Sequence, residues 1–200
     1  MRTIIYSERQ RRLHIFLRNM IQSKSVYLWN IKRPKTDSAV LDSLTGIYNR
    51  FGINLYLQEL HPQVGIDYAI ILLNLDNFKK IQHEFGLNYA DTALIQVATI
   101  LCKNLRDTDI VGRYGEHEFI IILSNTNLEK AKRVTQRLAK LIQAKAITLK
   151  TQSILLQASC GVSSSTPQAP SNQVLEQADQ ALCMAKSYGF NQIQERHAEL

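Results

Sequence analysis

The chain has 200 residues, of which 45% are apolar, and it carries a net charge of +7 at neutral pH. This length and apolar content suit one domain with a full core and a short extension. No apolar run approaches the roughly 18 residues that a membrane-spanning helix needs, and no signal peptide opens the chain. Cys102, Cys160 and Cys183 lie in apolar patterns without metal-like spacing, so we expect reduced core thiols of a cytoplasmic protein.

The positive charge is concentrated at the N-terminus. Residues 1–41 contain nine Lys or Arg against two acidic side chains, whereas the remaining 159 residues contain 15 of each sign. An amphipathic helix is predicted over 7–23, and its apolar residues follow helical spacing: Leu13, Phe16, Leu17, Met20 and Ile21. The short apolar face favours a docking or dimer-forming helix over a membrane binder. The basic arm also suits nucleic acid or an anionic membrane, and a solvated helix is the plainer alternative.

Pro34 marks a linker over 32–38, so we predict a basic helical arm and linker over 1–40 and a domain over 41–200. In chain order the domain is predicted to contain helix 49–60, strand 68–75, helices 78–85 and 91–106, a β-hairpin around 110–123, helix 128–144, strand 153–162 and helix 173–186. This order is typical of an α+β sheet packed by helices.

The tip of the predicted hairpin carries an unusual run of charge. The segment Arg113-Tyr114-Gly115-Glu116-His117-Glu118-Phe119 lies between two apolar runs, and a Gly-led turn between two strands predicts a hairpin. A hairpin tip of this kind holds Glu-His-Glu at a fixed place above a sheet, which suits a functional site.

Five ordered segments of the chain resemble the GGDEF domain of diguanylate cyclases. They are DSLTGIYNR at 42–50, NLDNFK at 74–79, GLNYAD at 86–91, GEHEF at 115–119, and ADQAL with AKSYGFN at 178–191. The resemblance implies a nucleotidyl-cyclase-like palm: a central, mostly antiparallel sheet of about five strands, flanked by helices, with a β-hairpin carrying the motif.

The resemblance also implies a reaction, in which two GTP molecules on two domains are joined with the help of divalent metal. The family's metal carboxylates correspond to Asn74 and His117 here. Magnesium prefers anionic oxygen, whereas imidazole suits softer metals. We therefore expect no required cofactor, no Mg²⁺ site and no catalytic residues.

Other family contacts are also changed. Glu116 replaces the second glycine of the motif and adds bulk and like charge near a triphosphate. Gln82 replaces the guanine-recognising Asn, and Phe190 replaces a phosphate-binding Arg. Five further positions of the degenerate site keep the family's residue: Asp76, Asp91, Gly115, Glu118 and Lys186. Each loss would cost on the order of 1–3 kcal/mol in binding or transition-state stabilisation, which argues against turnover.

Two ways of rescuing the site remain open. Glu116 or Glu118 would supply a carboxylate if the turn were reset by one residue, although strand alternation predicts that Glu118 points away from the position of His117. His117 and Asp76 would alternatively hold a transition metal. A polar hairpin tip without metal is the interpretation we prefer.

A second site is implied by an RxxD segment, Arg106-Asp107-Thr108-Asp109, at the family's spacing before the hairpin motif. In the family this is an inhibitory site for cyclic di-GMP, and Arg137 falls where a further arginine of that site lies. Guanidinium groups bind phosphate or a guanine edge in bidentate fashion. The alternative is structural, with an Arg ending a helix and an Asp starting a strand.

The sequence therefore favours a catalytically inactive GGDEF-like module that acts through a regulatory protein partner or as a homodimer, and as a cyclic di-GMP receptor at Arg106, Asp109 and Arg137. The alternative function is a weak diguanylate cyclase or another GTP-binding enzyme. The retained Arg113 and Asp42 are expected to pair, as in the family, and to clamp the N-terminal turn to the hairpin base.

Overall fold

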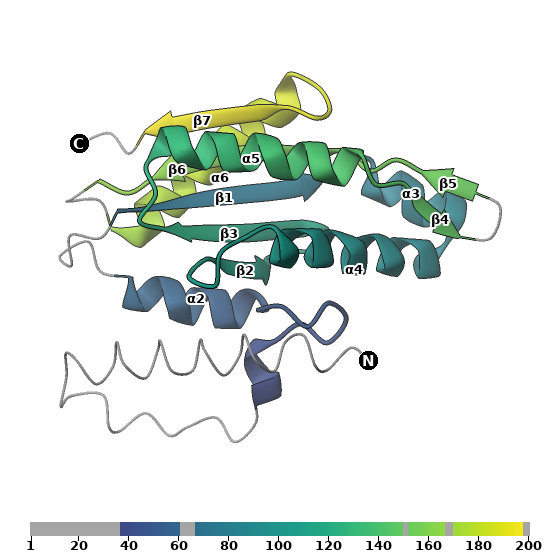
Figure 1. Cartoon of the computed structure of the whole chain (residues 1–200), viewed down its shortest axis with the longest axis horizontal. Coiled ribbons are helices and arrows are strands. Elements are labelled where there is room, and N and C mark those ends of the chain that lie inside the picture. Colours follow the sequence, from purple (N-terminus) through teal and green to yellow (C-terminus); the bar gives the residue numbers. More distant parts are fainter. Residues whose placement is uncertain (1–36, 61–66, 150–151, 167–169, 198–200) are drawn as a thin grey trace.

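The computed structural model describes residues 37–60, 67–149, 152–166 and 170–197 (Figure 1). The predicted helix over 7–23 and most of the predicted linker lie outside them. None of the described helices is long and apolar enough to cross a membrane.

A five-stranded sheet in the order β2-β3-β1-β6-β7 forms the centre of the domain (Figure 1). The central strand β1 (Tyr68–Leu75) is antiparallel to β3 (Glu118–Ser124) and to β6 (Ala158–Ser164). On the edges, β2 (Ile110–Arg113) is antiparallel to β3, and β7 (Ile193–His197) is parallel to β6. This confirms the predicted sheet, and every residue of β1 is buried, as its continuous apolar run predicts.

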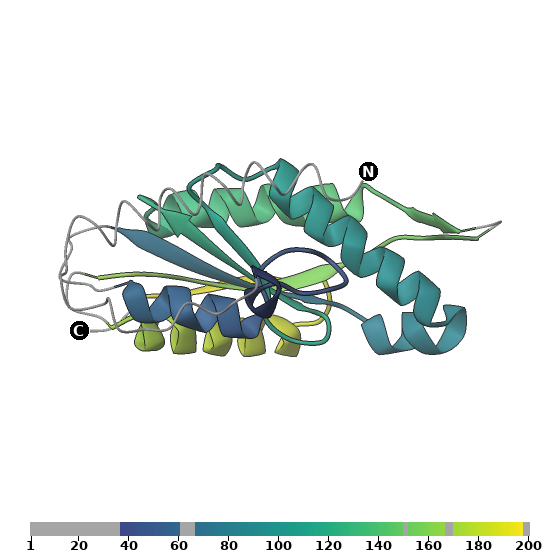
Figure 2. The same ribbon diagram turned by 90° about the horizontal axis from the view of Figure 1, so that it is seen from below.

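Helices cover both faces of the sheet (Figure 2). On one face α2 (Arg50–Glu59) and α6 (Ser171–Ser187) share a core cluster with alternate residues of the sheet. On the other face α4 (Leu87–Lys103) and α5 (Leu128–Gln143) form the larger cluster, which also includes residues of the short α3 (Phe78–Phe85). The period of two along β1 and β3 therefore divides the core into two layers.

Gly161 explains how closely one helix approaches the sheet. A Cβ atom at this position of β6 would lie 2.1 Å from the carbonyl oxygen of Ala178 and 2.2 Å from the backbone nitrogen of Leu182. The backbone of α6 therefore rests directly on β6, which fixes the position of the helix end that carries Lys186.

Four predictions need correction. The helix expected over 91–106 runs from Leu87 to Lys103. Its N-cap is Gly86, whose φ of 86° ends the preceding helix and lets the next one begin at once. The strand expected over 153–162 is divided, since β5 (Gln152–Ile154) pairs with β4 (Ile147–Leu149) in a separate sheet. Strand β7 was not predicted. Cys102 and Cys160 are buried, as expected, but Cys183 is exposed.

Candidate functional site

The hairpin between β2 and β3 is fixed at its base by an ion pair. Arg113 Nη1 lies 3.2 Å from Asp42 Oδ2, and the two side chains are only 18% and 17% exposed. The Arg113 guanidinium also donates a 2.7 Å hydrogen bond to the carbonyl oxygen of Glu116. Asp42 in turn accepts hydrogen bonds from the backbone N–H and the hydroxyl of Thr45. The predicted pairing is confirmed, and it ties the hairpin tip to the N-terminal turn.

Replacing either partner of this pair should therefore loosen the hairpin. We expect Arg113→Met and Asp42→Asn each to lower the free energy of unfolding by about 2 kcal/mol, because each leaves a half-buried charge without its partner. Urea denaturation of the two variants and of the double variant would measure this. A coupling energy near zero in that cycle would contradict a direct interaction.

Glu118 points away from His117, as predicted, and lies beside Asn74. The two residues are paired across β1 and β3, and Asn74 Nδ2 donates a 2.9 Å hydrogen bond to Glu118 Oε1. Lys186 Nζ, from the end of α6, lies 3.9 Å from the same oxygen. A Cβ atom at Gly115 would lie 2.7 Å from Glu118 Oε2, so the carboxylate also leans over the turn. The carboxylate of Glu118 is thus held between an amide and an ammonium group.

His117 lies on the opposite face of the hairpin strand, as strand alternation predicts. Its ring stacks on Phe78, the first residue of α3, with a centroid distance of 5.3 Å and an interplanar angle of 12°. Its Nδ1 is buried and has no hydrogen-bond partner among the described residues. Burial lowers the pKa of His117 below its ordinary value of 6.5, against the opposing effect of Glu118 and Glu116.

The depressed pKa of His117 predicts a dependence of stability on pH. Between the folded pKa of His117 and its unfolded value of about 6.5, the unfolded state binds more protons than the folded state. The contribution of neutral His117 to the free energy of unfolding should therefore be complete above about pH 6.5 and decrease as the pH falls towards the folded pKa. Thermal unfolding at about pH 7.5 and 5.5 should show a smaller pH effect for His117→Phe than for the wild type. His83→Gln, at an exposed position of α3, is the control. An equal pH effect in all three proteins would exclude this assignment.

The other predicted positions of the degenerate site lie apart from the hydrogen-bonded group of Asn74, Glu118 and Lys186. Asp76 is buried and fully engaged, since its Oδ1 accepts from Ser159 Oγ and its Oδ2 from the backbone N–H of Asn191, both at 2.9 Å or less. Asp76 therefore anchors the loop that follows α6. The remaining positions lie at or near the surface, half-buried for Gln82 and exposed for the others: Asp91, Glu116 and Phe190.

No described contact joins His117 to Asn74 or to Asp76. The structure thus brings Asn74, Glu118 and Lys186 together and separates His117 from them. Within the described residues, three or more His, Cys, Asp or Glu side chains never gather in a way that would hold a metal ion. The cross-strand register that places Glu118 beside Asn74 carries no signal in the sequence.

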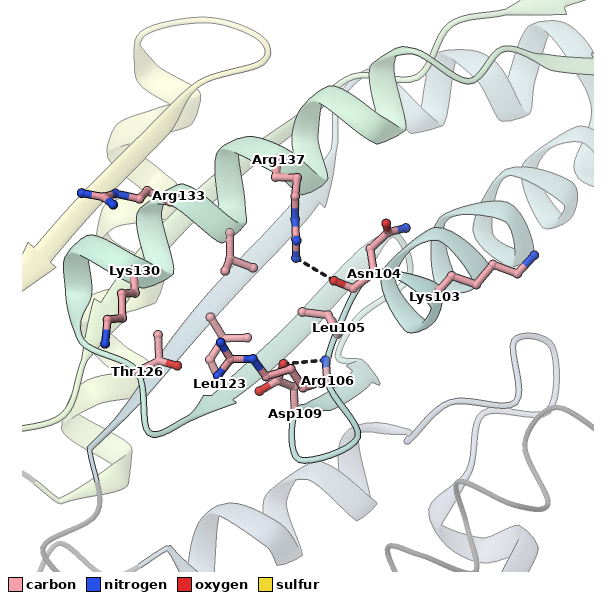
Figure 3. A pocket seen from close by; sticks show the side chains of 11 residues that line it. Lys103, Asn104, Leu105, Arg106, Asp109, Leu123, Thr126, Lys130, Arg133 and Arg137 are labelled. Carbon is pink, nitrogen blue, oxygen red and sulfur yellow. Dashed lines mark hydrogen bonds between the residues drawn. The ribbon is translucent and has the colours of Figure 1, made fainter.

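The three residues of the second predicted site line one cavity of about 550 Å³ between α4, α5 and the start of β2 (Figure 3). Arg137 reaches across from α5, and its Nη2 donates a 2.7 Å hydrogen bond to the carbonyl oxygen of Asn104. Asp109 Oδ2 accepts a 2.9 Å hydrogen bond from the backbone N–H of Arg106. Asp109 therefore caps the turn, as the structural alternative predicts. The same turn also brings Arg106 and Asp109 to the cavity that Arg137 lines, as a ligand site would need.

Three further basic residues line the same cavity: Lys103, Lys130 and Arg133. The ends of Lys103 and Arg133 extend away from it, whereas Arg106 and Arg137 approach it from opposite sides (Figure 3). These three residues were not predicted from the sequence. Lys130 and Arg133 do have a signal in the sequence, because their spacing with Arg137 at i, i+3 and i+7 places them along one side of α5. Lys103 lies on α4 and has no such signal.

Comparisons with known proteins agree on one family. The family model of the diguanylate cyclase GGDEF domain matches residues 39–192. The chain is 31% identical over 159 residues to the diguanylate cyclase DgcP of Pseudomonas aeruginosa, covering 78% of this chain and 24% of that protein. It is 33% identical over 152 residues to the diguanylate cyclase DgcZ of Escherichia coli, covering 76% and 51%. The chain thus spans about half of the length of these relatives or less.

Solved structures show the same fold. The GGDEF domain of DgcB from Caulobacter crescentus, in complex with c-di-GMP, has a TM-score of 0.74 at 20% identity, covering 78% of this chain and 95% of that one. The diguanylate cyclase SiaD of Pseudomonas aeruginosa, in complex with its activator SiaC, has a TM-score of 0.74 at 25% identity. That match covers 96% of this chain and 69% of the SiaD chain.

Proposed function

Because the chain belongs to the family of diguanylate cyclase GGDEF domains, we propose that it is a signalling module that binds cyclic di-GMP without synthesising it. The observation that carries the proposal is the convergence of Arg106, Asp109 and Arg137 on one cavity. These residues come from two segments, the turn after α4 and the middle of α5, so their meeting depends on the fold.

The chemistry of this cavity suits a cyclic dinucleotide. Two guanidinium groups on opposite walls offer forked donors to phosphate oxygens or to the O6 and N7 edge of guanine, and a carboxylate accepts from guanine N–H groups. Five basic side chains line the cavity against the single carboxylate of Asp109, which favours an anionic ligand. The solved complex of the DgcB domain with c-di-GMP supports this ligand class for the family.

The hairpin site, by contrast, does not offer the oxygen ligands that Mg²⁺ requires. Asn74 is a neutral amide, and the nearby carboxylate of Glu118 is already bonded to Asn74 and faces the ammonium group of Lys186. Both oxygens of Asp76 are bonded within the protein. Among the described contacts, Glu118 Oε2 is the one carboxylate oxygen of these two residues without a hydrogen bond. Since a hard dication needs several oxygen ligands, this donor set fits magnesium poorly, and no catalytic step is assigned to it.

Isothermal titration of the purified chain with cyclic di-GMP tests the proposal. We expect saturable heat, which weakens as salt is raised because basic groups carry the binding. Cyclic di-AMP is the matched control, since it has the same phosphates and lacks the guanine edges. Absence of heat with cyclic di-GMP would remove the receptor function, and equal binding of both ligands would remove its guanine specificity.

A protein partner completes the proposed function, because a module without turnover must pass its signal on by contact. The complex of SiaD with its activator SiaC shows that one protein with this fold engages a regulatory protein. A homodimer is the second arrangement that we propose. Affinity purification of the chain with and without cyclic di-GMP, followed by mass spectrometry, should identify a partner whose recovery depends on the ligand.

A weak diguanylate cyclase is the second candidate, and the position of Glu118 favours it. Its carboxylate lies at hydrogen-bond distance from Asn74, the position of a lost metal ligand. If the hydrogen bond to Asn74 opened, Glu118 would supply one anionic oxygen there. Product formed from GTP with Mn²⁺, and lost in Glu118→Gln, would favour this candidate over the receptor.

A further inference from the structure

Exposed apolar side chains are concentrated on one layer of the domain. Of the seven large apolar side chains that are exposed among the described residues, five lie on α2, on α6 or in the loop that follows α6: Phe51, Leu55, Met184, Tyr188 and Phe190. Because α2 and α6 lie on the same face of the sheet and share a core cluster, the exposed residues on these two helices belong to one outer layer (Figure 2). We call this layer the α2/α6 surface.

The α2/α6 surface also carries acidic charge. Glu176 and Asp179 are exposed on α6, about two turns and about one turn before Met184, while the basic Arg50 and Lys186 are exposed at the start of α2 and the end of α6. A surface that combines exposed aromatic and aliphatic groups with carboxylates is suited to an amphipathic helix with basic flanks. Where such groups form one contiguous patch, they usually mark an interaction site.

One segment of this chain has the required chemistry. Residues 1–36 contain nine basic side chains and one acidic side chain, Glu8. Within them, the stretch 7–23 combines four arginines with a five-residue apolar stripe at helical spacing. We propose that this N-terminal arm docks on the α2/α6 surface of its own chain, with its stripe on Phe51 and Leu55 and its arginines near Glu176 and Asp179.

The chain enters the domain at the right place for this arrangement. The described part begins with the short helix η1 (Asp37–Val40). Hydrogen bonds join it to Asn49, the N-cap of α2: Asn49 Nδ2 donates to the carbonyl oxygen of Ala39, and the backbone N–H of Asn49 donates to that of Val40. Phe51 lies two residues further on. The stretch 24–36 can span up to about 45 Å, and a helix over 7–23 is about 25 Å long, so the arm can reach both helices.

Hydrogen exchange measured by mass spectrometry on the full chain tests this docking. We expect the amides of residues 7–23 to exchange at least about tenfold more slowly than in a free helix of this length. Phe51→Asp with Leu55→Asp should remove that protection, as should Glu176→Lys with Asp179→Lys. Leu87→Asp with Leu155→Asp is the matched control, because these two exposed apolar residues lie away from α2 and α6.

The exchange should be followed over about a hundredfold range of protein concentration, with sedimentation to give the mass. Protection that is independent of concentration in a monomer supports docking within one chain. Protection that disappears on dilution assigns the arm to a second copy and overturns the proposal. Fast exchange of residues 7–23 in the wild type, or equal protection in the α2 variant and the control, overturns it as well.

Discussion

Replacing Arg106 or Arg137 by alanine is expected to weaken the binding of cyclic di-GMP at least about 30-fold. Each arginine faces the cavity and would make charge-assisted hydrogen bonds of about 1.5–3 kcal/mol to the ligand. Arg137 must also release the carbonyl oxygen of Asn104, to which it is bonded in the described structure. Titration calorimetry of the two variants against the wild type measures the effect.

Two matched variants make this prediction specific. Lys80→Ala removes an exposed positive charge on α3, far from the cavity lining, and should leave the affinity unchanged. Arg133→Ala should weaken binding less than about threefold, because its guanidinium extends away from the cavity (Figure 3). If Arg106→Ala and Lys80→Ala gave the same affinity, the cavity would not be the binding site.

Restoring the family's residues in the hairpin site should create a metal site that the wild type lacks. We expect the triple variant Asn74→Asp, Glu116→Gly and His117→Asp to bind Mn²⁺ roughly 100-fold more tightly than the wild type. The new carboxylate at position 74 would lie beside that of Glu118, whose hydrogen bond to Asn74 would be lost. The substitution at position 117 adds a second new carboxylate and removes the stacking of His117 on Phe78. Electron paramagnetic resonance of free Mn²⁺ during titration measures this directly.

A control variant must show that tighter Mn²⁺ binding comes from the position of the new carboxylates and not from added negative charge alone. The control variant Asn54→Asp with Asn88→Asp adds two carboxylates at exposed positions of α2 and α4. It should bind Mn²⁺ no better than the wild type. Equal affinities of the control and the triple variant would show that the hairpin site is not the place where metal binding was lost.

Much of the fold follows from local sequence patterns. Strand β1 was predicted to the residue, because its apolar run is bounded by polar residues and is buried on both faces. Strand β7 was missed, since Ile193-Gln-Glu-Arg-His is a charged edge strand without a period of two. The break between β5 and β6 was also missed, because both halves favour strand and only their different partners separate them.

Only those residues of the candidate site that belong to a motif with a known spacing could be predicted from the sequence. Arg106, Asp109 and Arg137 were named from the sequence, and they do share a cavity. Lys103 was not named, because it joins the cavity only through the packing of α5 beside the end of α4. Lys130 and Arg133 were not named either, although their spacing with Arg137 marks one side of α5. The bond between Asn74 and Glu118 likewise depends on the register of β1 and β3, which no local pattern encodes.

The most direct test of the account is the conversion of GTP by the purified chain. GTP would be supplied with Mg²⁺ or Mn²⁺, and cyclic di-GMP would be quantified by mass spectrometry. We predict no product above the level of a heat-inactivated sample, because Asn74 replaces a metal-binding carboxylate by a neutral amide and is bonded to Oε1 of Glu118. Steady formation of cyclic di-GMP that is lost in Asp76→Asn or Glu118→Gln would contradict this and identify the chain as an active cyclase.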